Sequence, residues 1–209
     1  IKLSGVAVKN SAAGYVLDAR TNQSYKAVNN LINGGVDVYR ISNVVNGAAF
    51  SNGSFYIASN AKAKSIIDKN VTENNVQFIA VDQKPTALSK IKKARIALWD
   101  MYGGSMPSGW TRLILEKFNY AFDVIYAKDV DTGNLRSKYD VIVFVGGAIP
   151  AVGSGVNTNA GFGFNNPNPD SIPVEYRNRL GRITAAKSIP QLKLFMEAGG
   201  NIVTIGSST

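Results

Sequence analysis

The sequence predicts an α/β fold in two parts, the second of which is an open, mostly parallel sheet flanked by helices. Short apolar runs with strand character alternate with segments whose apolar residues recur every three to four positions, which is typical of helices. The runs "FDVIYA" (122–127) and "YDVIVFVGG" (139–147) are predicted as strands buried on both faces, as in a parallel sheet. Residues 83–93 are polar and basic and contain a proline, which is typical of a linker between domains.

The first part, residues 1–85, is expected to form a small α/β domain. Its elements are expected in the following order: strand 14–18, a helix capped by Asn22 and ended by the glycines of 33–35, strand 36–42, a hairpin with an Asn-Gly turn in 50–59, a helix opened by Ser59 or Asn60, and strand 76–82.

The second part, residues 94–209, alternates stronger apolar strands with helices. The strands are expected at 94–100, 122–127, 139–147 and 201–208, and the last helix at 188–200, where Ser188 can cap it and two glycines end it. This alternation is typical of an open flavodoxin-like sheet. Such sheets bind ligands at the carboxyl ends of their strands.

The stretch "DMYGGSMPSGW" (100–110) is the candidate ligand-binding turn. Gly103 and Gly104 permit tight backbone geometry, and Ser105 or Ser108 can cap the helix that carries Trp110. Free backbone N–H groups at a helix start favour an anion. The alternative is that the turn only joins a strand to a helix and that Trp110 packs in the core.

A second glycine pair, Gly146 and Gly147, ends a neighbouring strand at the same edge of the expected sheet. It is followed by a long segment (146–173) that is rich in Gly, Asn and Pro and has no periodicity. A loop of this length is usually functional or mobile, so it could cover the crevice as a lid. A solvated connector is the alternative.

The chain contains no His and no Cys, so neither a Ser–His–Asp system, a Cys–His system nor a zinc site with those ligands can form from its residues. Ser207 and Ser208 follow the last predicted strand at an elbow-like position, but the G-x-S-x-G pattern is not completed. The acidic residues around "KDVDTGNLRSKYD" lack the spacing of a calcium loop and are expected to cap and to be solvated. No catalytic residue, metal ligand or cofactor is therefore predicted within the chain.

The formal charge of +9 raises the question of a nucleic-acid partner. The basic residues are scattered along the sequence, the one tight cluster is "KIKKAR" (90–95), and no recognisable nucleic-acid motif accompanies it. A solvated basic surface is the preferred interpretation. No apolar run approaches the roughly 20 residues that a membrane-spanning helix needs. The start at Ile1 suggests a fragment or a processed chain.

The order of these pieces resembles the region that follows the catalytic domain in bacterial zinc carboxypeptidase-like proteins. The segments that carry the resemblance are "YVLDARTNQSYKAVNNLINGGVDVYR" (15–40), "FSNGSFYIAS" (50–59), residues 92–150 with the start "KKARIALWDMYGGSMPSGWTR", and "FMEAGGNIVTIGSST" (195–209). The resemblance covers most of the chain and rests on pattern-level motifs without a catalytic fingerprint.

In that family the later part is similar in fold to class I glutamine amidotransferases, which implies a truncated amidotransferase-like domain for residues 94–209. The amidotransferase nucleophile is a cysteine after the strand that corresponds to "NIVTIG" (201–206), and here Ser207 or Ser208 occupies that neighbourhood. The resemblance also implies that zinc and its His and Glu ligands belong to an upstream catalytic domain of the same protein. A periplasmic or secreted location is expected on the same ground.

The sequence therefore predicts a non-catalytic accessory domain of a metallocarboxypeptidase-like protein, which assists peptide hydrolysis by an upstream domain. The alternative is a stand-alone module that binds a small molecule or a peptide at the turn between Gly103 and Trp110. An enzyme in its own right is the least favoured interpretation, because the usual bases and nucleophiles are missing.

Overall fold

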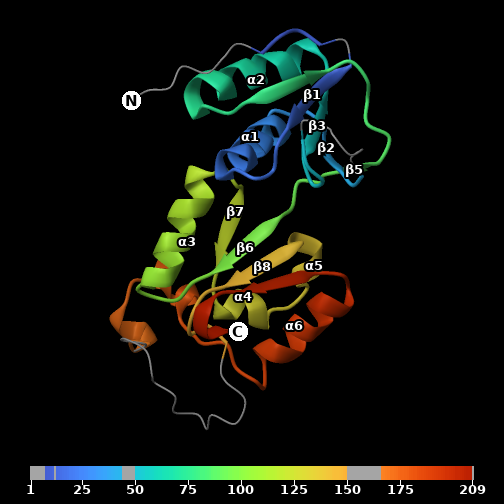
Figure 1. Cartoon of the computed structure of the whole chain (residues 1–209). Helices are drawn as coiled ribbons and strands as arrows, with labels where there is room; N and C mark the ends of the chain where they lie inside the picture. Colours follow the sequence, from blue (N-terminus) through green and yellow to red (C-terminus); the bar gives the residue numbers. More distant parts are fainter. Residues whose placement is uncertain (1–7, 12, 44–49, 150–165, 209) are drawn as a thin grey trace. The chain divides into compact units, whose positions relative to one another are not determined.

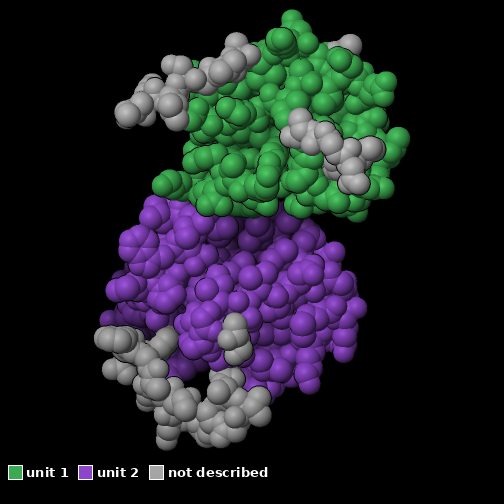
Figure 2. All heavy atoms as spheres, in the orientation of Figure 1, with its two compact units in different colours: residues 1–93, 117–120 green, residues 94–116, 121–209 purple. Residues whose placement is uncertain are grey.

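The computed structural model describes residues 8–11, 13–43, 50–149 and 166–208, and the chain divides into two units (Figure 2). Unit 1 comprises residues 1–93 with 117–120, and unit 2 comprises residues 94–116 with 121–209. Unit 1 is built on an antiparallel sheet and unit 2 on a parallel sheet flanked by helices, so the protein has a mixed α/β fold.

Unit 1 has five short strands and two helices in its described residues. They are β1 (Gly14–Leu17), α1 (Asn22–Asn33), β2 (Val38–Ile41), β3 (Phe55–Ala58), α2 (Ala61–Asn74), β4 (Phe78–Val81) and β5 (Leu88–Lys90). The strand order is β4-β1-β3-β2-β5, and every neighbouring pair is antiparallel.

The two helices of unit 1 pack on one face of its sheet because both carry an apolar stripe. Leu31 of α1 and Ile67 of α2 are fully buried in the same cluster as Leu17, Phe55 and Ile57 of the strands. Alternate residues of the same strands point to the other face. There Val16, Ile41 and Tyr56 form a smaller buried cluster.

The helix caps, linker and turn that the sequence predicts for unit 1 are confirmed only in part. The cap of α2 is confirmed, since the Asn60 side chain accepts a hydrogen bond from Ala63 N–H at 2.8 Å. The prediction that Asn22 caps α1 is wrong, because the helix begins at Asn22 and its N-cap residue is Thr21. Residues 83–93 contain a strand, β5, which pairs with β2. The Asn-Gly turn precedes β3, whose partners are β1 and β2.

The strands and the two long helices that the sequence predicts for unit 2 occur in the predicted order, and two short helices between the second and third strands were not predicted. The elements of unit 2 are β6 (Ile96–Trp99), α3 (Met106–Lys117), β7 (Phe122–Ile125), α4 (Ala127–Asp131), α5 (Leu135–Lys138), β8 (Val141–Phe144), the 3-10 turns η1 (Pro169–Ser171) and η2 (Val174–Arg179), α6 (Ser188–Glu197), β9 (Asn201–Thr204) and η3 (Gly206–Ser208). The strand order is β7-β6-β8-β9 and all pairs are parallel, which confirms the predicted parallel sheet (Figure 1).

The two faces of this sheet are covered unequally. Connections between parallel strands are right-handed, so α3 lies on one face and α4, α5 and α6 lie on the other. On the α4–α6 face, Trp99 and Phe144 are buried, with ring centroids 6.5 Å apart. On the α3 face, Val203 of β9 is 45% exposed. The expected lid segment lies largely outside the described residues, at 150–165.

Candidate functional site

The connections of the parallel sheet change direction between β6 and β8. From β6 the chain passes through α3 to β7, and it then returns to β8 on the other side of β6. The segments that follow β6 and β8 therefore leave toward opposite faces of the sheet. In open α/β sheets this switch point forms a crevice at the carboxyl ends of the strands, where ligands bind. The candidate site consists of residues 100–110, 145–149 and 205–208.

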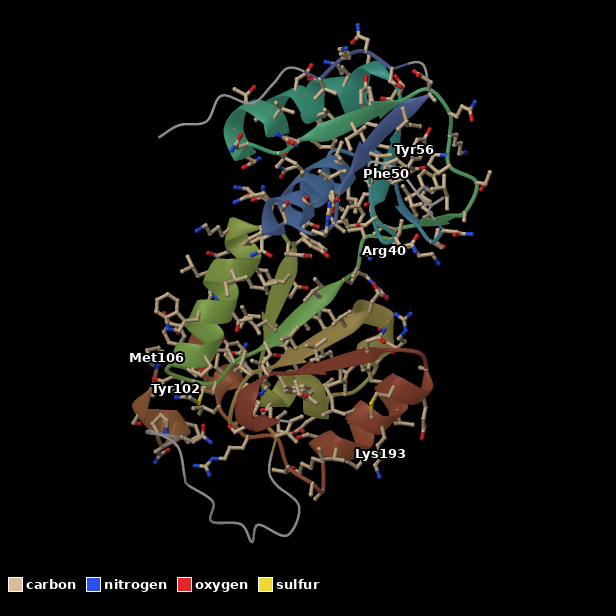
Figure 3. All side chains as sticks on the ribbon, viewed as in Figure 1. Arg40, Phe50, Tyr56, Tyr102, Met106 and Lys193 are labelled. Atoms are coloured by element: carbon tan, nitrogen blue, oxygen red, sulfur yellow. The ribbon has the colours of Figure 1, made fainter. Side chains whose placement is uncertain are left out.

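The turn after β6 is open to solvent. Gly103 and Gly104 have φ angles of 82° and 74°, in the left-handed region that favours glycine. A Cβ atom added at either position would meet no atom within 4 Å. Gly104 N–H donates to the carbonyl of Met101 at 2.9 Å, which closes the turn. Tyr102 and Met106 lie near each other at the start of α3 (Figure 3).

The N-terminus of α3 has fewer free donors than the sequence suggests. Ser105 is the cap, because its Oγ accepts from Ser108 N–H at 3.1 Å and its carbonyl accepts from Gly109 N–H at 2.9 Å. Pro107 has no N–H. Of the residues at positions 106 to 108, only Met106 has an N–H for which the described chain provides no acceptor. The attraction of this helix start for an anion is correspondingly small.

The predicted ligand-binding residues of α3 separate into inward and outward positions. Ser108 is fully buried, and its Oγ has no hydrogen-bond partner among the described residues. Trp110 is 61% exposed, so the alternative in which this side chain packs in the core is wrong. The periodicity of α3 correctly grouped its apolar residues on one face, but that face points away from the sheet. Ser108 and Trp110 therefore cannot act as one binding surface.

The carboxyl ends of β8 and β9 are fastened together by Ser208. Its buried Oγ accepts from the N–H groups of Ala148 at 3.0 Å and Ile149 at 3.3 Å, and it donates to the carbonyl of Val145. A serine that is occupied in this way holds two loops in place and is not free as a nucleophile. Ser207 is exposed, and its Oγ would lie 3.3 Å from a Cβ added at Gly146. The structure thus brings Gly146, Ser207 and Ser208 together, because β8 and β9 are neighbours in the sheet.

Asp100 is a member of this edge that the sequence analysis did not single out. It follows β6 directly, is 5% exposed, and accepts a hydrogen bond from Met101 N–H at 2.9 Å. A carboxylate that is so nearly buried is uncommon. Its position after an apolar strand, inside the quoted turn, was the available signal.

The carboxyl group with the most strongly lowered pKa lies at the opposite end of the strands, where β8 begins. Asp140 precedes β8, and Arg95 donates to it from Nε at 3.0 Å and from Nη2 at 2.8 Å. These hydrogen bonds, with a further one from Arg136, hold the pKa of the Asp140 carboxyl well below its usual range. The amino end of a parallel strand is not where such sheets bind ligands, so this cluster has a structural role. The sequence analysis expected the Asp residues of this segment to cap and to be solvated, whereas Asp140 forms ion pairs with Arg95 and Arg136.

The other acidic residues of this region also have structural partners. Asp129 accepts from Tyr126 N–H at 2.8 Å at the start of α4, which confirms its capping role. Asp131 accepts from the Ser188 hydroxyl at 2.6 Å. Ser188 also accepts from Thr184 N–H and is the first residue of α6, so it is not the cap of that helix. In the described ranges, no three His, Cys, Asp or Glu side chains form a group that could hold a metal ion.

Comparisons of the chain with protein-family models, with curated proteins and with solved structures find no match. Among the helices that the structure describes, none has the length and apolar character to cross a membrane.

Proposed function

We propose that this chain is a non-catalytic accessory segment that acts by packing against a catalytic domain of the same protein. The observation that carries the proposal is the outward face of α3. Met106, Trp110, Leu113 and Ile114 are exposed by 78%, 61%, 50% and 55%, and their spacing of four, seven and eight residues places them on one side of the helix. An exposed apolar stripe of this size is typical of an interaction surface.

The α3 face of the sheet supports the same proposal. A parallel sheet is normally covered on both faces, and a helix about 10 Å wide covers roughly two strands that are 4.8 Å apart. Four strands need two helices on each face, but α3 is the one helix of the described chain on its side. Val203 and Ile205 remain exposed there by 45% and 43%. A partner domain that contributes an apolar surface would cover both areas.

The sequence resemblance provides the proposed identity of that partner, a zinc metallocarboxypeptidase domain upstream in the same protein. The strand order of unit 2, in which the four strands run 2-1-3-4 across the sheet, supports a flavodoxin-like, amidotransferase-related domain. The engagement of Ser208 in three hydrogen bonds supports a non-catalytic role for the elbow-like position.

The test is made on the complete product of the gene. We expect it to release C-terminal residues from peptides, to lose this activity with a zinc chelator and to recover it when zinc is restored. Residues 1–209 alone should release none. A gene product that carries no catalytic domain in addition to these residues, or activity that a chelator leaves unchanged, would remove the peptidase proposal.

The second candidate is a ligand-binding module at the turn between Gly103 and Trp110. It is favoured by the open space around both glycines and by the position of the turn at the switch point. Trp110 lies on the first turns of α3, so its fluorescence is a direct reporter. Titration of the chain with inorganic phosphate and with short peptides tests the candidate. An unchanged signal up to about 10 mM, ten times a weak Kd of 1 mM, would exclude it.

A further inference from the structure

The positive charge of the protein is concentrated in unit 1. Residues 1–93 and 117–120 contain 13 Lys and Arg against 5 Asp and Glu, whereas the rest of the chain contains 10 against 9. Unit 1 therefore carries a net charge of +8 and unit 2 a net charge of +1. The division of the chain into units changes the interpretation of the charge, which appears scattered along the sequence. A local excess of this size repels itself and favours an anionic partner.

Five of these cations gather along the β2–β5 edge of the antiparallel sheet. We call this set the basic strip, and its members are Arg40, Lys84, Lys90, Lys92 and Lys93. Two of them lie beside Tyr39 of β2: Lys90 is its cross-strand partner on β5, and the Lys84 Nζ lies 5.9 Å from the centre of its ring. Arg40 follows Tyr39 on β2, opposite Ser89 of β5. The Arg40 side chain points to the opposite face of the sheet from Tyr39, where its guanidinium lies 5.1 Å from the centre of the Phe55 ring.

Little negative charge offsets the basic strip. All five side chains are on exposed residues, and Lys90 is the one member with an ion pair in the described chain, to Asp37 at 2.7 Å. Both partners of that pair are more than half exposed, so the pair is weak. Arg95, the last residue of "KIKKAR", is excluded from the strip because it is bound to Asp140 in unit 2.

The spacing of the cations in the basic strip indicates which kind of anion it can bind. A single small anion needs donors that converge on one point. Four of the five cations instead belong to one ten-residue segment, 84–93, which includes an extended edge strand. The segment bends at residues 86–87 and is extended from Leu88 onward, where residues two apart are separated by about 6.6 Å. Lys90, Lys92 and Lys93 therefore form a short line along the edge, and Lys84 lies beside Tyr39. A line of cations fits a linear polymer with regularly spaced negative charges.

We propose that the basic strip of unit 1 binds a flexible linear polymer of phosphate groups. Binding is electrostatic and therefore depends steeply on salt concentration, since each contact releases a condensed counterion. The exposed lysines donate to phosphate oxygens from flexible stems and impose no sequence preference. This inference is independent of the accessory role that α3 supports.

The test compares two triple variants of the full 209-residue chain that lose the same charge. Lys84→Gln, Lys92→Gln and Lys93→Gln alter the basic strip, and Lys26→Gln, Lys62→Gln and Lys69→Gln alter α1 and α2 of the same unit. The probe is a fluorescently labelled single-stranded thymidine oligonucleotide, followed by anisotropy across a range of salt concentrations. Inorganic polyphosphate is the competitor, and circular dichroism confirms that both variants are folded.

The strip variant is expected to bind at least about tenfold more weakly at low salt and to reduce the slope of log K against log salt by about 2, at 0.7 for each lost contact. The control variant should change affinity less than about threefold under the same conditions. Displacement by polyphosphate would show that phosphate groups are sufficient, and failure to displace would overturn the phosphate assignment. Equal weakening by both variants, no binding by the unaltered chain, or binding only to anionic lipid vesicles would also overturn the proposal.

Discussion

Ser207 and Ser208 are neighbours in sequence, but their surroundings differ completely. Ser208 is buried with three hydrogen bonds between the ends of β8 and β9, whereas Ser207 is exposed. A pattern that places both after a predicted strand cannot tell which hydroxyl points inward. That distinction depends on the loop after β8, which is about sixty residues away in the sequence.

Replacement of Ser208 by Ala should lower the free energy of unfolding by about 1–3 kcal/mol, because the N–H groups of Ala148 and Ile149 lose their buried acceptor. Ser207→Ala is the matched control and should change it by less than about 0.5 kcal/mol. Urea denaturation of both variants measures the difference. Equal stabilities for the two variants would contradict the assigned role of Ser208.

Asp140 should make the stability of the protein depend on pH in a defined direction. Its pKa is lowered in the folded state by hydrogen bonds from Arg95 and Arg136, so its contribution is fully present above the unfolded pKa of about 3.9. The contribution is lost as the pH falls from there toward the lowered pKa. Asp140→Asn removes this dependence.

Thermal unfolding from pH 6 to pH 2 provides the measurement for Asp140. The unaltered protein should be more stable than Asp140→Asn near neutral pH, and the gap should narrow below about pH 4. Asp82→Asn is the control, because that carboxylate is on an exposed residue and takes part in no hydrogen bond or ion pair of the described chain. A gap that stays constant over the whole range would show that the ion pairs of Asp140 do not stabilise the fold.

Among the elements, α3 shows most clearly what periodicity can and cannot predict. The spacing of Trp110, Leu113 and Ile114 correctly predicts a helix with one apolar face. The same spacing contains no information about what that face contacts. The expectation of core packing assumed that the partner is the sheet, but the sheet contacts the side of α3 that contains Ser108.

If the outer face of α3 is an interaction surface, its side chains contribute little to folding. Trp110→Ser and Leu113→Ser should each change the free energy of unfolding of the 209-residue chain by less than about 0.5 kcal/mol. Leu98→Ala is the contrasting variant, because Leu98 is fully buried in β6 and its loss should cost about 2–5 kcal/mol. Chemical denaturation compares the three. A large loss with Trp110→Ser would mean that this face supports the fold of the chain itself.

Strand pairing in unit 1 marks another limit of prediction at the scale of elements. Each run of apolar residues identifies a strand, as in 14–18 and 76–82, which become β1 and β4. Alternation of strands and helices suggests parallel pairing, yet all pairs of this sheet are antiparallel. The order is set by side-chain packing between distant segments. The short strand β5 carries two polar residues out of three and has no apolar pattern that could reveal it.

For the whole molecule, the amino-acid composition correctly limits which kinds of catalytic and metal-binding side chains are available. The absence of His and Cys from the sequence restricts the available nucleophiles and metal ligands, and this restriction does not depend on the fold. The parallel sheet of unit 2 could also be predicted, because strands buried on both faces are strongly apolar. The concentration of charge could be predicted as well, because residues 1–93, the first domain and linker expected from the sequence, already contain 12 Lys and Arg against 5 Asp and Glu.

The proposed account of the whole protein is that unit 2 presents α3 to a catalytic domain. Radical footprinting with mass spectrometry tests this most directly, because Met106 and Trp110 are reactive side chains on the exposed stripe. Internal references are available, since Met196 of α6 is 49% exposed on the other face and Trp99 is 3% exposed. The measurement compares residues 1–209 with the complete gene product.

The account predicts that Met106 and Trp110 oxidise rapidly in the 209-residue chain and several-fold more slowly in the complete gene product, while Met196 and Trp99 react equally in both. Equal oxidation of Met106 and Trp110 in the two proteins would contradict it, since the stripe would then face solvent even when the proposed catalytic domain is present.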